Sequence, residues 1–312
     1  MMTVLSFFPE NLCEPWNVWE NRWNEIQEIR LRVNCPVMIR TQKGEYFLKY
    51  NTCNVIYSDK DMENVFRHLC HDSVYAYEEE RKWGYLTLTG GHRVGITGEI
   101  IYRQNQGYIV KYIRYMNIRI AHEMTGIAQD IMSYLYEHDL PCNTLIISPP
   151  AIGKTTLLRD MIRMYADGNG EHVGINVGII DERGEIAGAY RGSASLNCGM
   201  RSDVITGGNK RNGVEVLVRT FAPRVVAMDE IGCKGDAQAV LYAGVSGCAV
   251  LATAHGTSIE DVTEKEELSM VMKEHLFKRY IVLHKNEKGD RYVKIWDGEG
   301  RCICGKKQLQ QY

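Results

Sequence analysis

Hydrophobic and polar residues alternate through much of the first third of the chain, and this alternation predicts β-strands. One alternating stretch is Glu28–Arg40, a second covers residues 84–101 as two strands joined by a glycine pair, and a third covers residues 109–121. Between the first two lies a predicted helix, which opens with a capping box at Ser58–Asp61 and continues with apolar residues at helical spacing (Met62, Val65, Phe66 and Leu69). The first third is therefore expected to form a small mixed α/β domain.

Beyond about residue 125 the pattern changes to short, apolar segments separated by amphipathic ones. The apolar segments predict buried strands (residues 143–148, 173–180, 224–228 and 248–254), and the amphipathic segments predict helices (residues 127–135, 154–165, 213–221 and 234–246). Strands that alternate with helices favour a parallel sheet covered on both faces. We therefore expect an α/β protein with a smaller mixed α/β domain at residues 1–124 and a mostly parallel-sheet domain at residues 125–312, the latter ending in an exposed tail.

Composition and charge narrow the class of protein. Hydrophobic residues make up 45% and charged residues 24% of the 312 residues, which is typical of a soluble globular protein. A formal net charge of −2 argues against a strongly basic nucleic-acid binder. The N-terminus lacks the basic region of a signal peptide, no apolar run approaches the ~18 residues needed to cross a bilayer, and the 10 cysteines lack the paired spacing of a zinc site. These features predict a cytoplasmic protein with free thiols, for which a membrane role requires a partner.

The stretch SPPAIGKTT (Ser148–Thr156), between a predicted strand and a predicted helix, is similar to a phosphate-binding loop. In such a loop, backbone N–H groups at a helix N-terminus point at phosphates, the Lys154 ammonium reaches the β- and γ-phosphates, and the Thr155 hydroxyl ligates Mg²⁺. Ser148 and Ala151 depart from the usual pattern, because glycine is common at both positions and a positive φ would strain either residue. The whole loop is a candidate ATP-binding site (Ser148, Pro149, Pro150, Ala151, Ile152, Gly153, Lys154, Thr155 and Thr156).

Three further predicted strands end in chemically active side chains. Asp229 and Glu230 follow one strand, His255 follows another, and an acidic segment follows the third (Asp181, Glu182 and Glu185). Because ligands of open α/β sheets bind beyond the carboxyl ends of the strands, we expect these groups to converge with the loop at one edge. Asp229 is a candidate Mg²⁺ ligand there, and a neighbouring carboxylate is a candidate to polarise an attacking water. The sequence therefore predicts a site that binds ATP with Mg²⁺.

At these four stretches the chain resembles the ATPases of type II and type IV secretion systems, within the RecA-like superfamily. It resembles the stage III sporulation protein AA family more closely, over nearly its whole length. The segments that carry the resemblance are EIRLR (28–32), GYLTLTGGHRVGITGE (84–99), NIRIA (117–121), SPPAIGKTTLLRD (148–160), DERGEIAG (181–188), MRSDV (200–204), VRTFAPRVVAMDEIG (218–232) and ATAHG (252–256). The resemblance implies a RecA-like P-loop NTPase core behind the N-terminal domain, a ring-shaped homo-hexamer, and an ATPase that powers assembly or operation of a sporulation-associated membrane transport channel.

The resemblance also implies roles for individual residues. Lys154 and Thr155 take the phosphate-loop roles. The segment with Glu185 stands where secretion ATPases have an acidic "Asp box", and Glu185 matches their catalytic glutamate. The segment with His255 stands at their "His box", which implies that His255 senses the γ-phosphate. Secretion ATPases often have glycine before the Walker B glutamate where this chain has Asp229, and the family's loop is usually richer in glycine. Glu185 and Glu230 both remain candidates for activating water.

Ring ATPases commonly complete a site with an arginine from a neighbouring subunit or domain, because guanidinium stabilises charge on the transferring phosphoryl group. The candidates are Arg93, Arg119, Arg183, Arg201 and Arg219. Of these, Arg201 and Arg93 are favoured as arginine fingers.

Two other functions stay open. The first is a nucleic-acid-dependent RecA-like ATPase, against which the near-neutral charge and the lack of an aromatic-rich basic stripe both argue. The second is a non-hydrolysing, nucleotide-binding scaffold, for which the altered loop at Ser148 and Ala151 argues. The resemblance implies two partners, further copies of the chain and a membrane-anchored sporulation channel protein, on the mother-cell side of the membrane complex. Nucleic acid is not expected as a partner.

Overall fold

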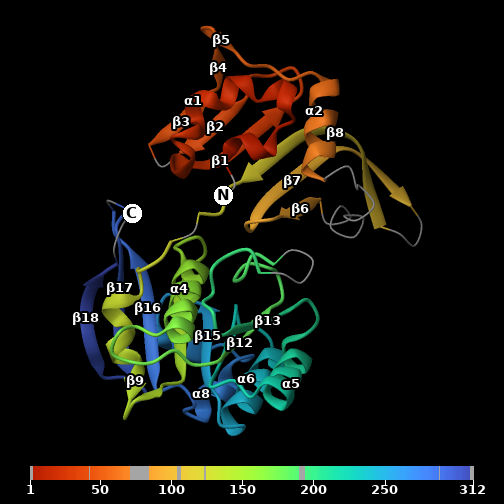
Figure 1. The fold of residues 1–312 in the computed structure, drawn as a ribbon. Helices are drawn as coiled ribbons and strands as arrows, with labels where there is room; N and C mark the ends of the chain where they lie inside the picture. Colours follow the sequence, from red (N-terminus) through yellow and green to blue (C-terminus); the bar gives the residue numbers. More distant parts are fainter. Residues whose placement is uncertain are drawn as a thin grey trace. The chain divides into compact units, whose positions relative to one another are not determined.

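The computed structural model describes residues 3–41, 43–70, 84–103, 107–122, 124–189, 194–287 and 289–309. The chain forms two compact units, Met1–His122 and Glu123–Tyr312, and each is described by itself (Figure 1). Whether residues 1–124 and 125–312 fold as independent domains remains a prediction.

The N-terminal unit is built on an antiparallel six-stranded sheet in the order β3-β2-β1-β8-β7-β6. Its strands are β1 (Ile26–Arg32), β2 (Met38–Thr41), β3 (Gly44–Phe47), β6 (Tyr85–Leu88), β7 (His92–Arg103) and β8 (Gly107–Arg119). The other elements are η1 (Val4–Phe7), η2 (Glu10–Leu12), η3 (Glu14–Trp16), α1 (Asn17–Glu20), η4 (Trp23–Glu25), β4 (Lys49–Tyr50), β5 (Cys53–Asn54) and α2 (Asp59–Leu69). The predicted strands and helix are confirmed, and the Ser58–Asp61 capping box at the start of α2 is present.

The two faces of this antiparallel sheet differ sharply in chemistry. One row of paired residues that crosses five strands is wholly buried (Ile39, Ile29, Ile118, Val94 and Leu86). The adjacent row lies on the opposite face and is charged (Glu45, Arg40, Glu28, Arg119 and Arg93). Alternate residues of a strand share a face, so Arg30 and Arg32 join Glu28 there. We call this surface the arginine face, defined by Arg30, Arg32, Arg40, Arg93 and Arg119.

The C-terminal unit is built on an eight-stranded sheet in the order β13-β12-β14-β15-β11-β16-β17-β18. Its strands are β11 (Thr144–Ser148), β12 (Val177–Asp181), β13 (Ser202–Thr206), β14 (Val225–Met228), β15 (Ala249–His255), β16 (Arg279–Lys285), β17 (Arg291–Asp297) and β18 (Cys302–Gln308). The other elements are η6 (Gln129–Leu135), β9 (Tyr136–Glu137), β10 (Leu140–Pro141), α4 (Lys154–Asp167), α5 (Lys210–Phe221), α6 (Lys234–Val245), α7 (Ile259–Thr263) and α8 (Ser269–Lys273). Among the described residues, none of the helices is both long and apolar enough to cross a membrane.

The expected α/β class with a mostly parallel sheet is confirmed. All neighbours from β13 to β16 pair in parallel, and β17 and β18 add an antiparallel edge. Three expectations were wrong in detail. In place of the helix expected at residues 127–135, Gln129–Leu135 form the 3₁₀ helix η6. Helix α5 begins at Lys210, with Asn209 as its N-cap, and the expected tail is strand β18 as far as Gln308.

Both faces of the parallel strands are covered by helices, as continuously apolar strands require. Ile146 of β11 belongs to an apolar cluster with residues of η6 and α4, whereas its neighbours Leu145 and Ile147 belong to a second cluster with residues of α5, α6 and α8. This alternation follows the two-residue period of a strand. In Figure 1, α4 accordingly lies on one side of the sheet and α5 and α6 on the other. The sheet is thus fixed between two layers, with its strand ends left for other groups.

Candidate nucleotide-binding site

The four predicted strand ends converge at one edge of the parallel sheet. Strands β12, β14, β15 and β11 are neighbours in that order and all run in the same direction. Asp181, Asp229, His255 and Ser148 end or follow these strands, so the topology alone brings them to the same edge. The same edge receives the N-terminus of α4, which begins at Lys154.

The loop between β11 and α4 contains two positive φ angles. Gly153, the N-cap of α4, has φ 109°, and Ala151 has φ 62°. Ser148 has no such constraint, because it is the buried last residue of β11, and its hydroxyl donates to the Pro149 carbonyl at 2.7 Å. Of the two departures from the usual loop, Ala151 is therefore the one in a strained backbone position.

The loop leads directly into the first turn of α4. The first N–H groups of a helix have no partner within the helix, and the helix dipole favours an anion beside them. Thr156 lies in that first turn, Ile152 packs against the apolar cluster of η6 and α4, and Pro150 is exposed. The backbone of the loop is therefore suited to hold phosphate groups.

Lys154 is a buried cation among acidic side chains. Its surface is 7% exposed, and its Nζ lies 3.2 Å from Nδ1 of His255. Burial lowers the pKa of Lys154, whereas the negative charges of Glu230, Asp229 and Glu185 act to raise it. The Lys154 ammonium thus lies close enough to Glu230, Asp229 and Glu185 to interact electrostatically with all three.

His255 joins Lys154 to Glu230. Its Nε2 lies 3.1 Å from Oε1 of Glu230, opposite the nitrogen that faces Lys154. A neutral imidazole with its proton on Nε2 satisfies both contacts, because Nδ1 then accepts from Lys154 and Nε2 donates to Glu230. The other oxygen of Glu230 lies 3.7 Å from Nη1 of Arg183. The Glu230 carboxylate is therefore held between a histidine and an arginine.

Asp229 lies beside the hydroxyl of the loop threonine. Thr155 Oγ1 is 3.5 Å from Asp229 Oδ2, and Thr253 Oγ1 donates to Asp229 Oδ1 at 3.0 Å. The Glu230 backbone N–H in turn donates to Thr253 Oγ1 at 2.8 Å. Thr253 is fully buried and positions both acids, a role that the sequence analysis missed. A hydroxyl within an otherwise apolar, buried strand was the signal that could have revealed it.

Glu230 has a positive φ of 31°, which is rare for a residue with a side chain. Its backbone N–H donates to Asp229 Oδ1 at 3.0 Å and to Thr253 Oγ1 at 2.8 Å, and these two contacts hold it in this conformation. Such strain is tolerated when the surroundings determine the conformation, and it concentrates at functional sites.

The acidic segment begins with a structural residue, Asp181, which is the last residue of β12. Asp181 is fully buried and accepts the N–H groups of Glu185, Ile186 and Ala187 at 2.8, 3.1 and 2.8 Å. Burial raises the pKa of Asp181, and these hydrogen bonds act to lower it. Asp181 therefore shapes the turn that carries Glu185, whose carbonyl is also held by Arg159 at 2.6 Å.

Comparison with known proteins identifies the family. Residues 17–303 match the family described as "Sporulation stage III, protein AA". Over 304 residues, which cover 97% of this chain and 97% of the relative, the sequence is 37% identical to stage III sporulation protein AA of Bacillus subtilis (strain 168). The chain belongs to the stage III sporulation protein AA family.

Two solved structures are similar in fold to this chain. The ATPase DotB of Legionella pneumophila matches with a TM-score of 0.58 and 13% identity, over 95% of this chain and 83% of that one. The pilus retraction motor PilT with bound ADP matches with a TM-score of 0.60 and 12% identity, over 96% of this chain and 83% of that one. These likenesses confirm the expected arrangement of a mostly parallel sheet behind a smaller N-terminal part.

The two favoured arginines lie in different settings. Nη1 of Arg201 donates to the Ala166 carbonyl at 2.9 Å, near the C-terminal end of α4 and therefore far along the helix from the loop. Arg201 thus supports the far end of the helix in this sporulation-family chain. Arg93 belongs to the arginine face of the N-terminal unit, where its guanidinium lies 5.6 Å from the centre of the Tyr85 ring.

The donor set at the strand ends fits Mg²⁺. Among the described residues, no cluster of three or more His, Cys, Asp or Glu side chains could hold a metal by itself. Mg²⁺ bound with a nucleotide needs no such cluster, because it takes one or two protein oxygens and completes its shell with phosphate oxygens and water. Thr155 Oγ1 and the Asp229 carboxylate, 3.5 Å apart, supply oxygens of that kind.

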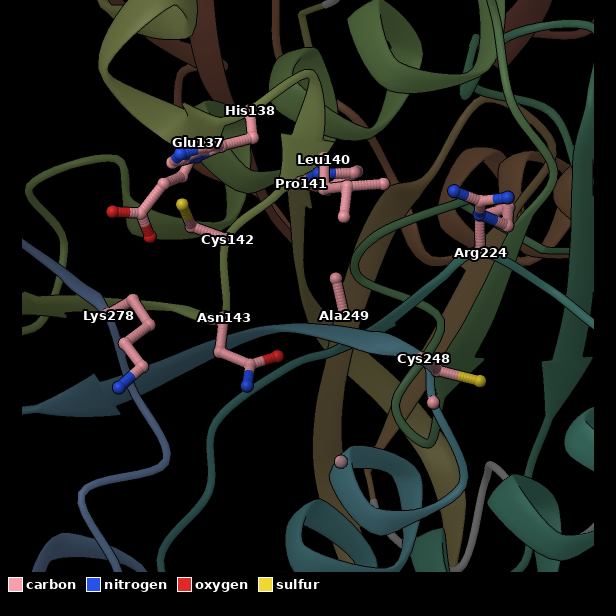
Figure 2. Close-up of a pocket in the computed structure, with 12 residues that line it drawn as sticks. Glu137, His138, Leu140, Pro141, Cys142, Asn143, Arg224, Cys248, Ala249 and Lys278 are labelled. Carbon is pink, nitrogen blue, oxygen red and sulfur yellow. The ribbon is translucent and has the colours of Figure 1, made fainter.

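A cavity of about 530 Å³ lies at the opposite edge of the same sheet (Figure 2). Its lining comes from residues that precede or begin β11, β14, β15 and β16 (among them Asn143, Arg224, Cys248 and Lys278). No residue of the 148–156 loop lines it. The cavity is therefore separate from the nucleotide site at the carboxyl edge.

Proposed function

We propose that this chain is a Mg²⁺-dependent ATPase whose turnover powers the assembly or operation of a sporulation-associated membrane transport channel. The observation that carries the proposal is the contact series Lys154–His255–Glu230 beside the Thr155–Asp229 contact. A lysine, two side-chain oxygens and a carboxylate thus lie in one cluster next to a helix N-terminus, which supports roles in phosphate binding, Mg²⁺ coordination and proton transfer.

ATP binding is assigned to residues 148–156 and the first turn of α4. The loop N–H groups would hold the phosphate chain, and Lys154 would contact the β- and γ-phosphates. When bound, Mg²⁺ would neutralise charge on the phosphate oxygens between Thr155 and Asp229. His255 contacts both Lys154 and Glu230, and it would respond to the γ-phosphate by exchanging one of these contacts.

Hydrolysis needs a group that accepts a proton from the attacking water. The water oxygen bonds to the γ-phosphorus, the bond to the β–γ bridging oxygen breaks, and ADP leaves with the bonding electrons. We assign the proton-accepting role to Glu230, because its carboxylate lies in the same cluster as His255 and its backbone is strained into place. Glu185 is the alternative base, and its position depends on the turn that Asp181 holds.

The relatives support the motor and sporulation parts of the proposal. One solved structure is an ATPase and another is a pilus retraction motor with bound ADP. The full-length relative is a sporulation protein. Transferred to this chain, these descriptions favour a nucleotide-driven motor that works in sporulation. Its action on the mother-cell side, through a membrane-anchored channel protein as partner, is the further part of our proposal.

A ring of six copies would complete the site. The arginine face carries five arginines with Glu28 and Glu45, so it has an excess of positive charge. Glu28 pairs with Arg30 at 3.0 Å, Arg119 at 3.7 Å and Arg40 at 3.9 Å. We assign the arginine finger to Arg93 rather than Arg201, because Arg201 already holds the end of α4. In this proposal Arg93 acts on the nucleotide of a neighbouring subunit.

Steady-state ATP hydrolysis across protein concentration tests the proposal. Turnover per subunit should rise with concentration as rings assemble, require Mg²⁺, and fall to background in Lys154→Ala. A Lys273→Ala variant, changed at an exposed lysine of α8, should keep wild-type turnover. Equal rates of ATP hydrolysis in the wild type and Lys154→Ala would refute the proposed ATPase activity.

A non-hydrolysing scaffold would give a different result, and the strained Ala151 is the observation in its favour. Such a protein would bind ATP and change its oligomeric state with no phosphate release at any concentration. Turnover stimulated by single-stranded nucleic acid and lost steeply with salt would instead indicate the nucleic-acid-dependent motor.

A further inference from the structure

The guanidinium of Arg291 lies against the phosphate loop. Strand β17 runs antiparallel to β16, so its first residue, Arg291, pairs with the last residue of β16, Lys285, at the edge where the parallel strands end. A methyl group built on Gly153 would lie 3.3 Å from Nη1, 3.4 Å from Cζ and 3.6 Å from Nε of Arg291. These nearly equal distances mean that the flat face of the guanidinium packs on Gly153.

This packing leaves the edges of the guanidinium available. Among the described residues, no oxygen accepts a hydrogen bond from the Arg291 side chain and no carboxylate pairs with it. Its backbone is fixed, because its carbonyl accepts the N–H of Leu309 at 3.0 Å. Lys154, the other cation of the loop, is by contrast in contact with His255.

The position is electrostatically unfavourable for a cation without an anion nearby. Gly153 is the N-cap of α4, and the N-terminus of a helix carries partial positive charge from its free N–H groups. A guanidinium held there adds a second positive charge to the first. An anion between the helix N-terminus and the guanidinium removes the repulsion and accepts hydrogen bonds from both.

The strand order indicates which part of the nucleotide this anion is. Thr155, Asp229 and His255 mark the Mg²⁺ and γ-phosphate side, which lies toward β14 and β15 from the loop strand β11. Arg291 lies on the other flank of β11, beyond β16. A phosphate chain whose γ end points toward β14 and β15 has its nucleoside end on the flank of Arg291.

We infer that Arg291 binds the α-phosphate end of the nucleotide, the part that ATP and ADP share. This inference rests on the proposed function and adds a ligand-binding residue that lies outside the loop and outside the four strand ends. The planar fork of arginine suits two oxygens of one phosphate, and Gly153 allows the close approach because it has no side chain.

The test is to measure dissociation constants of ADP and of a non-hydrolysable ATP analogue for the full-length chain. Arg291→Gln should weaken both by about ten- to hundredfold, since a charge-assisted hydrogen-bond pair is lost. Arg301→Gln is the matched control, because Arg301 lies at the opposite end of the β17–β18 hairpin and is 71% exposed. It should bind both nucleotides like the wild type.

The outcomes separate this inference from the proposed function. Equal weakening of ADP and the ATP analogue supports it. Weakening of the ATP analogue alone, or wild-type affinity in Arg291→Gln, overturns it while the nucleotide site stands. Absence of nucleotide binding in the wild type overturns both. If Arg291→Gln does not fold, Arg291→Lys decides, because lysine keeps the charge but loses the fork. Several-fold weaker binding of both nucleotides is expected, and unchanged affinity would overturn the inference.

Discussion

The carboxyl edge of the parallel sheet and the arginine face of the N-terminal sheet are both charged, but they are organised in opposite ways. At the carboxyl edge, Lys154 contacts His255, which contacts Glu230, and the negative charges of Glu230 and Asp229 act on the Lys154 ammonium. On the arginine face, one buried carboxylate, Glu28, serves several guanidinium groups. The first region is the one to which we assign nucleotide binding and hydrolysis, and the second contains cations in excess of its acids.

The excess of arginines on the N-terminal sheet could supply positive charge for catalysis. Phosphoryl transfer needs positive charge near the γ-phosphate in the transition state, and a loop lysine with Mg²⁺ is commonly supplemented by an arginine. The cluster at the carboxyl edge holds Lys154 and, through Glu230, Arg183. A surface with surplus arginines on the same chain is the natural source of a further cation when copies assemble. The arginine face could therefore supply one copy's cation to the phosphate site of another.

Replacement of Arg93 is expected to have the largest effect on kcat. Arg93→Gln should lower kcat by about 10³-fold, the lower end for an arginine finger, with ATP affinity little changed. Arg32→Gln, on the same face but in another row, is the control and should lower kcat far less. Phosphate release by rings of each variant measures both.

Mixed rings sharpen this prediction. Rings that combine Arg93→Gln and Glu230→Gln subunits should regain turnover that neither variant has alone, because some interfaces then join an intact Glu230 to an intact Arg93. If mixing restores nothing, the arginine face does not serve a neighbouring subunit.

The next largest effect on kcat distinguishes Glu230 from Glu185, the two candidate bases at the carboxyl edge. Glu230→Gln should lower kcat by about 10²- to 10³-fold while ATP still binds, because the carboxylate that accepts the proton is replaced by an amide of the same shape. Glu185→Gln should lower it by less than tenfold. The measurement is single-turnover hydrolysis with binding followed in parallel, and the reverse ranking of the two variants would assign the base to Glu185.

Sequence patterns predicted the strand ends well and their connections poorly. The loop, Asp229-Glu230 and His255 each follow a continuous apolar run, and such runs are recognisable without a structure. The register of the sheet is set by long-range pairing, so the contacts of Thr253 and the position of Arg291 beside Gly153 needed three dimensions. Strands β13 and β18 were missed because their residues are only half-buried or exposed and lack a clear period. Strands β16 and β17 were missed although β16 is continuously buried at its centre and β17 alternates.

The contribution of Glu28 to the free energy of unfolding tests whether its carboxylate holds the arginine face together. Burial alone raises the pKa of Glu28, but the hydrogen bond from Asn117 and the charges of Arg30 and Arg119 together lower it below the ordinary 4.5. The stabilisation is therefore present above pH 4.5 and is lost as the pH falls through the lowered pKa. Glu28→Gln should cost about 2 kcal/mol of unfolding free energy at pH 7.

Urea unfolding at several pH values measures this effect. The difference between wild type and Glu28→Gln should shrink as the pH falls below 4.5. Glu45→Gln, at an exposed position on the same face, is the control and should change stability by less than about 0.5 kcal/mol. A cost that stays constant with pH would mean that shape, rather than charge, holds Glu28 in place.

The smallest effects are expected at Ala151 and Ser148, the two departures from the usual phosphate loop. Replacement by glycine should change the free energy of unfolding in opposite directions at these two positions. Ala151 has φ 62°, so Ala151→Gly removes left-handed strain of about 1–2 kcal/mol but adds chain entropy to the unfolded state, for a net gain of about 0.5–1 kcal/mol. Ser148 ends a buried strand and donates to the Pro149 carbonyl, so Ser148→Gly should cost about 1 kcal/mol. Thermal unfolding without nucleotide measures both. If both variants were destabilised, the Ala151 conformation would be supported by contacts that outweigh its backbone strain, and the glycine-poor loop would be an adapted feature of this chain rather than a tolerated one.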